Sequence, residues 1–330
     1  MGVRFLRTWT ALSVGLRRPR PAPIGEIARR LSKLPPEKFR VETTALHTVK
    51  RSGNVRCKLH RVIPLSDNSG GADIVRFVEK RAPRKEYRAY RQLEKCDKQK
   101  PGLGPEVYFA REYRNGATLL VEHLPQVAGV FAQTTENALC LADRIFEISL
   151  LSPIDAHRLH EASDISRPGI FDLFLAAPQR ASSNAGESMR KRCEELARRF
   201  AGQQVMSTKV PCHNDLHWNN ISAGTGQSDG GDFRFIDWEL FGLNWIGADL
   251  HFFVRRALAG RIQMNFWQAL LGRYAERAER TFSADQATIE LAAYCYALYR
   301  SLLAVEAGTP LPLTERLLRE TERLMDLGRI

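Results

Sequence analysis

The feature that most constrains the fold is a change of hydrophobic periodicity at Pro125. Before this residue, short apolar runs separated by turn residues are typical of β-strands. After it, apolar residues recur at three- and four-residue spacing, which is typical of one face of a helix. A chain of 330 residues is long enough for two lobes. We therefore expect a strand-rich first part followed by a mainly helical second part.

The first part has a definite predicted order. A short helix at 24–34 ends at Pro35 and Pro36, which cannot continue it. Three strands, one helix and two further strands follow, and they are expected at 43–51, 55–65, 73–80, 85–96, 106–111 and 118–124.

The second part reads as helices interrupted by two polar segments, 209–223 and 233–250. The helices are predicted at 138–150, 156–161, 170–177 and 187–200, and as several amphipathic helices within 251–330. Because the two segments break the helical pattern, they are the first place to look for chemistry.

The positive charge of the chain is concentrated at its beginning. The net charge is +12, and residues 1–34 hold eight Lys or Arg against the single acid Glu26. We expect a solvated tail with no stable nucleic-acid partner, although contact with an anionic surface stays open. No apolar run is long enough for a transmembrane segment. A cytoplasmic protein is expected, with organellar import the alternative in a eukaryote because the acid-free start faintly resembles a presequence.

The first polar segment contains the spacing H-x-D-x-x-x-x-N, formed by His213, Asp215 and Asn220. This spacing suits a loop that catalyses phosphoryl transfer. A carboxylate there orients an acceptor hydroxyl and accepts its proton, and an amide oxygen five residues later can bind magnesium. Asp215 and Asn220 fit these two roles. The alternative is a loop in which both residues cap turns.

The second polar segment supplies another acid. An apolar strand begins 13 residues after Asn220 and ends at Asp237. A carboxylate at this place can share the magnesium ion with Asn220. An ordinary strand-ending acid is the alternative, but the order and spacing favour the metal site.

Upstream, Lys80 ends the third predicted strand and Glu86 lies early in the following helix. A lysine that contacts nucleotide phosphates needs a carboxylate to hold its long side chain. These two residues are the candidates for that pair, and two solvated surface charges are the alternative.

The rest of a nucleotide site is less marked. The only candidate for a loop covering the phosphates is the Ser52-Gly53-Asn54 turn, which has one glycine and is equally consistent with a plain turn. The adenine is expected at backbone groups near Glu122 and Leu124, where the last predicted strand leaves the first lobe.

Several side chains near the polar segments are candidates for binding the acceptor. Trp245 and two other tryptophans, together with Glu239, could hold an ammonium group by cation–π and charge attraction. Packing in the core is an equal alternative for each tryptophan. His217 is a candidate substrate contact, with a structural hydrogen bond as the more usual role.

With these residues in place, the phrases HNDLHWNN, IDWE and FGLNWIGADL resemble the aminoglycoside phosphotransferase and choline/ethanolamine kinase family. The resemblance implies a protein-kinase-like, α+β two-lobe fold, with a small antiparallel-sheet N-lobe and a larger helical C-lobe. The likeness covers about 40–330 in the order of the elements. With the basic start of the chain, we expect a basic extension at 1–35, an N-lobe at 36–124 and a C-lobe at 125–330.

The resemblance also implies roles. Asp215 is the expected catalytic base, Asn220 and Asp237 the expected magnesium ligands, and Lys80 the expected ATP contact. Asp249 matches an acid that braces the catalytic region, and His213 is expected to support it. The implied reaction is ATP-dependent phosphorylation of a hydroxyl on a small polar molecule, either an amino alcohol such as choline or ethanolamine, or an aminoglycoside or sugar.

The chain also departs from these relatives. Trp218 and Asn219 stand where the family often has smaller residues, and the expected phosphate loop is poor in glycine. The alternative function is a catalytically silent kinase-like scaffold. Against it, such a protein would have no chemical need for all four of the expected active residues.

Overall fold

The computed structural model of the 330-residue chain describes residues 22–46, 57–65, 75–97, 102–114, 116–125, 132–151, 191–193, 195–196, 199, 208–223, 233–305 and 311–327. Some predictions lie outside these residues: the turn at 52–54, the helices at 156–161 and 170–177, and the tail before residue 22.

A five-stranded antiparallel sheet forms the first lobe, with the strands in the order β1-β2-β3-β5-β4. The strands are β1 (Phe39–Leu46), β2 (Cys57–Pro64), β3 (Val75–Ala82), β4 (Val107–Tyr113) and β5 (Gly116–Glu122). The predicted sequence of three strands, one helix and two strands is confirmed.

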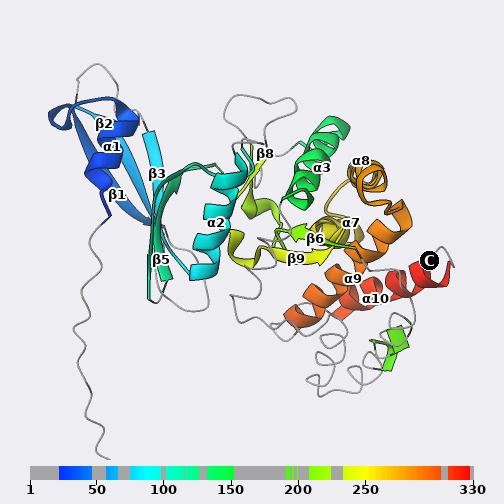
Figure 1. Cartoon of the computed structure of the whole chain (residues 1–330). Helices are drawn as coiled ribbons and strands as arrows, with labels where there is room; N and C mark the ends of the chain where they lie inside the picture. The colour runs from blue at the N-terminus through cyan, green and yellow to red at the C-terminus, as the bar shows by residue number, and fades with distance from the viewer. Residues whose placement is uncertain are drawn as a thin grey trace, which may run out of the picture.

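One helix covers each face of this sheet (Figure 1). Successive residues of a strand point to opposite faces, and β5 shows the consequence. Leu120 packs with α1 (Ile24–Ser32). The 3₁₀ turn η1 (Pro36–Lys38) connects this helix to β1. Leu119, the neighbour of Leu120, packs instead with the core that includes α2 (Arg84–Asp97). The centre of the sheet is therefore covered on both faces, and α2 faces the second lobe.

The second lobe is mainly helical, as its periodicity predicts. Its labelled helices are α3 (Thr135–Ser149), α7 (His251–Leu258), α8 (Met264–Phe282), α9 (Gln286–Val305) and α10 (Leu311–Asp326). Thr134 caps α3 by accepting a hydrogen bond from the backbone N–H of Asn137 at 3.2 Å. Among the described helices, none is both long enough and apolar enough to cross a membrane.

The two polar segments form short antiparallel strand pairs between the lobes (Figure 1). The pairs join β6 (Lys209–Cys212) to β9 (Gly242–Trp245), and β7 (Ile221–Ala223) to β8 (Phe233–Phe235). Three 3₁₀ turns lie beside them, η4 (Trp218–Asn220), η5 (Trp238–Leu240) and η6 (Ala248–Leu250). The candidate catalytic residues all follow or precede one of these strands.

Candidate active site

The loop after β6 is held in shape by Asn214. This residue has a positive φ of 65°, a conformation that asparagine tolerates better than most residues. Its side chain donates a hydrogen bond to the carbonyl of Leu240 at 3.0 Å and accepts one from Asn244 at 2.7 Å. These contacts tie the loop to η5 and β9, directly before Asp215.

A buried carboxylate braces the same loop from η6. Asp249 is only 2% exposed and accepts two backbone hydrogen bonds, from His213 at 2.8 Å and from Asn214 at 2.7 Å. Carboxylates that accept backbone N–H groups form strong, directional contacts. The structure therefore places Asp249 where a bracing role requires it.

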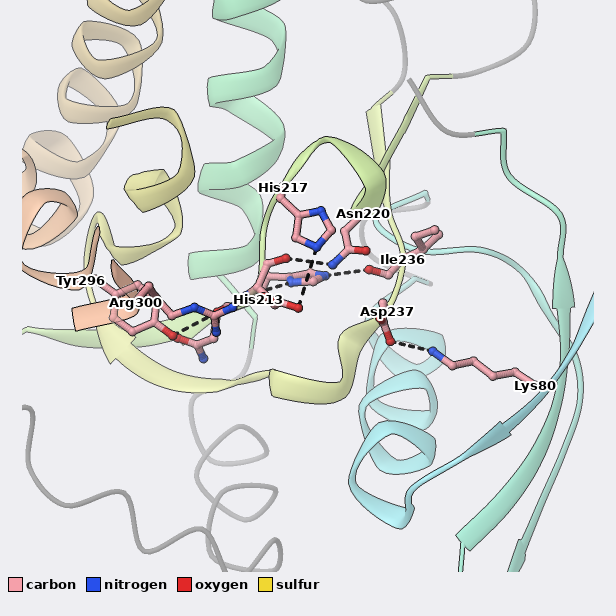
Figure 2. Close-up of polar contacts among 10 residues, drawn as sticks. Lys80, His213, His217, Asn220, Ile236, Asp237, Tyr296 and Arg300 are labelled. Atoms are coloured by element: carbon pink, nitrogen blue, oxygen red, sulfur yellow. Dashed lines mark hydrogen bonds and ion pairs between the residues drawn. The ribbon is translucent and has the colours of Figure 1, made fainter. Parts of the chain in front are cut away.

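His213 joins the loop to the second polar segment. Its Nε2 lies 3.0 Å from the carbonyl oxygen of Ile236 (Figure 2). Burial lowers the pKa of His213 to about 4, so the ring is neutral near pH 7. Because a carbonyl only accepts, Nε2 carries the proton, and Nδ1 is left to accept from the backbone N–H of Asp215 at 3.4 Å.

Asp215 is half-buried and forms an ion pair with Arg300 of α9. His217 Nε2 lies 4.0 Å from the other carboxylate oxygen, and burial lowers the pKa of this histidine. The arginine was not predicted from the sequence. A signal was available, because Arg300 is the only charged residue in the stretch 291–305.

The two candidate magnesium ligands meet through the pairing of β7 with β8. Asn220 directly precedes β7, and its backbone carbonyl accepts from Ile236 at 2.9 Å. Asp237, the next residue, has a positive φ of 63°. Strained backbone of this kind is concentrated at functional sites. The Asn220 side-chain nitrogen donates to the Asp215 carbonyl at 2.8 Å, which turns the amide oxygen the other way (Figure 2).

Lys80 crosses from β3 to this group. Its Nζ lies 2.5 Å from Glu86 Oε1 and 2.6 Å from Asp237 Oδ1. Burial alone would lower the pKa of Lys80, but Glu86 and Asp237 outweigh it and hold this pKa well above its ordinary value. Glu86 is fully buried, and its Oε2 has no hydrogen-bond partner among the described residues.

Glu239 belongs to this carboxylate group. Oxygen atoms of Glu86, Asp237 and Glu239 all lie within 4.8 Å of one another, and Glu239 is 3.8 Å from Lys85 of α2. The sequence proposed Glu239 as a substrate contact, whereas the structure places it toward α2 with the lysine. Carboxylate and amide oxygens suit Mg²⁺, so the donor set here fits that ion.

Glu122 has a contact that the sequence did not predict. Its carboxylate accepts two hydrogen bonds from Arg234 of β8, at 2.5 and 2.9 Å. This bidentate pair joins β5 of the first lobe to a strand beside the catalytic loop. Leu124 follows β5, and none of the described backbone hydrogen bonds uses its N–H or C=O group. The turn at 52–54 lies outside the described residues.

The three candidate tryptophans differ in burial. Trp238 is 0% exposed, and its indole N–H donates to the Phe235 carbonyl at 2.7 Å. Trp245 is 6% exposed and packs in the core, while its predicted contact with a substrate stays a prediction. Trp218 packs edge-on against Phe252, at 5.6 Å between ring centroids. Trp238 and Trp245 therefore bury apolar surface, and Trp218 packs against the core with part of its surface exposed.

Comparison with solved structures identifies the architecture. No protein-family profile matches the sequence, and no curated protein does. An ethanolamine kinase of Plasmodium vivax superposes with a TM-score of 0.50 at 14% identity, over 85% of this chain and 82% of that one. A choline kinase of Cryptosporidium parvum gives 0.50 at 13% identity, over 92% and 96%. The chain has a protein-kinase-like fold.

A thermostable aminoglycoside phosphotransferase mutant, solved with ADP and hygromycin B, is also similar, with a TM-score of 0.50 at 11% identity over 88% of this chain and 95% of that one. The two-lobe α+β architecture predicted from the sequence is therefore confirmed. Identities this low show the kinase-like fold alone.

Proposed function

We propose that this chain is an ATP-dependent phosphotransferase that moves the γ-phosphoryl group to a hydroxyl of a small molecule. One observation carries the proposal. The Lys80–Asp237 ion pair joins β3 of the first lobe to the loop of Asn220 and Asp215 in the second. Kinase-like phosphoryl transfer needs a phosphate-binding lysine, a base, and a metal-binding amide and acid, and Lys80, Asp215, Asn220 and Asp237 follow one another in that order along the chain.

In the proposed reaction, the acceptor hydroxyl oxygen forms a bond to the γ-phosphorus. The bond from that phosphorus to the oxygen shared with the β-phosphate breaks, and ADP leaves with the electron pair. Asp215 orients the hydroxyl and takes its proton. Glu86 and Asp237 keep the amine of Lys80 protonated, and its positive charge would face the phosphates.

Asn220 and Asp237 would hold Mg²⁺, and Glu239 lies close enough to contribute. When bound, the ion neutralises phosphate charge. We assign the nucleotide to residues 36–124, with the adenine near the Leu124 backbone, and the acceptor to residues 125–330. Residues 1–35 would then be an extension outside the reaction.

The test separates binding from turnover. Thermal unfolding of the full chain is followed with and without ATP and Mg²⁺, and ADP release is measured in parallel. Lys80→Ala should weaken nucleotide binding about tenfold or more, since it removes a charge-assisted contact. Asp215→Asn should keep nucleotide binding and lose about 10²- to 10⁴-fold in turnover. Lys58→Ala, at a half-exposed lysine of β2, is the control.

Stabilisation by ATP and Mg²⁺ that is equal in the wild type and in Lys80→Ala would contradict the assigned nucleotide site. Binding without any turnover would favour the scaffold alternative. If Asp215→Asn turned over at the wild-type rate, the assigned base would be wrong.

A further inference from the structure

Three arginines gather on the acceptor side of Asp215, and we refer to Arg255, Arg256 and Arg300 as the arginine cluster. The first two lie on α7 and the third on α9. The rings of His251 and Tyr296 join these helices at 4.9 Å between centroids. Arg255 is one helical turn beyond this histidine and Arg300 one turn beyond this tyrosine, so the two guanidinium groups lie in the same region.

The cluster reaches the catalytic loop by two routes. Arg300 pairs directly with Asp215, and it also donates to the Asn214 carbonyl at 3.4 Å. Arg256 lies over the ring of Phe252, at 5.0 Å from the centroid, and the His217 ring is 6.1 Å from the same phenylalanine. The arginines therefore border the place where an acceptor would meet Asp215.

Arg255 has no counter-charge among the residues that the structure describes. Within that part of the chain, its Nε is buried without a hydrogen-bond partner. Among the described residues, neither Arg255 nor Arg256 forms an ion pair. Burial lowers the pKa of Arg255, and the charges of Arg300 and Arg256 lower it further. From α10, Arg316 adds another positive charge by donating to the Leu258 carbonyl at the end of α7.

Three like charges held beside a single acid cost stability, because each guanidinium loses hydration and repels its neighbours. Asp215 is the one carboxylate in contact with the cluster in the described part of the chain. Arginine presents a planar fork of donors that matches the oxygens of phosphate and carboxylate groups. An anionic ligand would supply the missing acceptors.

We propose that the acceptor hydroxyl compound carries an anionic group, a phosphate or a carboxylate, which the arginine cluster binds while the hydroxyl faces Asp215. This inference rests on the proposed phosphotransferase function. Figure 2 shows Arg300 and Lys80 approaching the loop from opposite sides, so the acceptor anion and the nucleotide phosphates have separate sites. Choline and ethanolamine, which are among the acceptors that the resemblance implies, bring a positive charge that the cluster repels.

The first test measures anion binding without turnover. Inorganic phosphate and acetate are titrated by calorimetry into the full chain carrying Lys80→Ala, which removes the nucleotide-side lysine. Binding of at least one anion is expected at millimolar concentration. Adding Arg255→Gln should weaken it about tenfold or more, whereas adding Arg280→Gln, at an exposed arginine of α8, should not. Binding of phosphate or of acetate shows which anionic group the cluster prefers. If neither anion binds, the inference is overturned.

The second test measures acceptor preference by ADP release from wild-type protein with Mg²⁺ and ATP. The panel is glycerol 3-phosphate, glycerate, glycerol, ethanolamine and choline. An anionic member should exceed glycerol at least about tenfold in kcat/KM, and Arg255→Gln should remove that advantage mainly through KM. Preference for glycerol, ethanolamine or choline overturns the inference but leaves the phosphotransferase function intact. Anion binding without turnover of any member points instead to a failure of the proposed function.

Stability gives an independent readout. If Arg255 serves a ligand, Arg255→Gln should leave the free energy of unfolding unchanged or raise it, because an unpaired cation is removed from a like-charged group. If the arginine had only a structural role, the same substitution would lower the free energy of unfolding. Loss of stability together with unchanged anion affinity would therefore refute the assignment.

Discussion

Asp249 offers the sharpest test of how the catalytic loop is held. Its carboxylate accepts from two backbone N–H groups at 2.7 and 2.8 Å and is almost fully buried. In Asp249→Asn, one carboxylate oxygen becomes an NH₂ group that faces a backbone donor. One hydrogen bond to a charged group is lost and one buried N–H is left without an acceptor, which together cost about 2–4 kcal/mol.

The measurement is urea unfolding of the full chain at neutral pH, compared with Asp285→Asn. Asp285 is exposed and caps α9 by accepting from Thr288 at 2.8 Å, and asparagine caps helices about as well as aspartate, so this control should change by less than about 0.5 kcal/mol. Turnover of Asp249→Asn should also fall, because displacement of a catalytic group by about 1 Å can cost roughly 10²-fold. If both variants lost the same free energy, the bracing role of Asp249 would be refuted.

Three further predictions concern residues in the candidate active site or beside it. His213 is neutral in the fold, with a pKa of about 4 against about 6.5 when unfolded. Its contribution to the free energy of unfolding is therefore complete above pH 6.5 and is lost as the pH falls toward 4. In urea unfolding, the stability of His213→Gln should depend less on pH in that window than the stability of the wild type. Gly247→Ala should destabilise the fold by more than 1 kcal/mol, because φ is +93° and a Cβ would lie 2.7 Å from the Ile289 carbonyl oxygen of α9. In thermal melts the control Gly272→Ala should be neutral or stabilising, because a Cβ there would have nothing within 4 Å. Glu86→Gln and Lys80→Ala should weaken ATP affinity non-additively, since each acts on the same ion pair; additive losses in a double-mutant cycle would contradict this.

Features that depend on neighbouring residues could be predicted from the sequence. The alternation of apolar residues gave the strands of the first lobe, and three- and four-residue spacing gave α3 and the final helices. Lys80 and Glu86 could be paired because a strand end and the first turn of the next helix are close in the chain. The contact of Lys80 with Asp237 was not predicted, because the two residues are 157 positions apart in the chain.

Features that depend on the packing of distant segments could not be predicted. Arg300 lies 85 residues beyond Asp215, and only the contact of α9 with the catalytic loop joins them. The direction in which a side chain points could not be predicted either. Trp245 lies near the polar motifs in sequence, but its place at the end of β9 turns the ring into the core. Glu239 follows Asp237 by two residues, yet η5 directs it toward α2.

The central claim, that this chain transfers phosphoryl groups to a small-molecule hydroxyl, can be tested without knowing the acceptor. The full chain is incubated with a metabolite extract, Mg²⁺ and ATP labelled with ¹⁸O in the γ-phosphoryl group, and products are found by mass spectrometry. The account predicts at least one small molecule that gains the labelled phosphoryl group with the wild type and not with Asp215→Asn. Absence of any labelled product from protein that binds ATP, or equal labelling by Asp215→Asn, would contradict it.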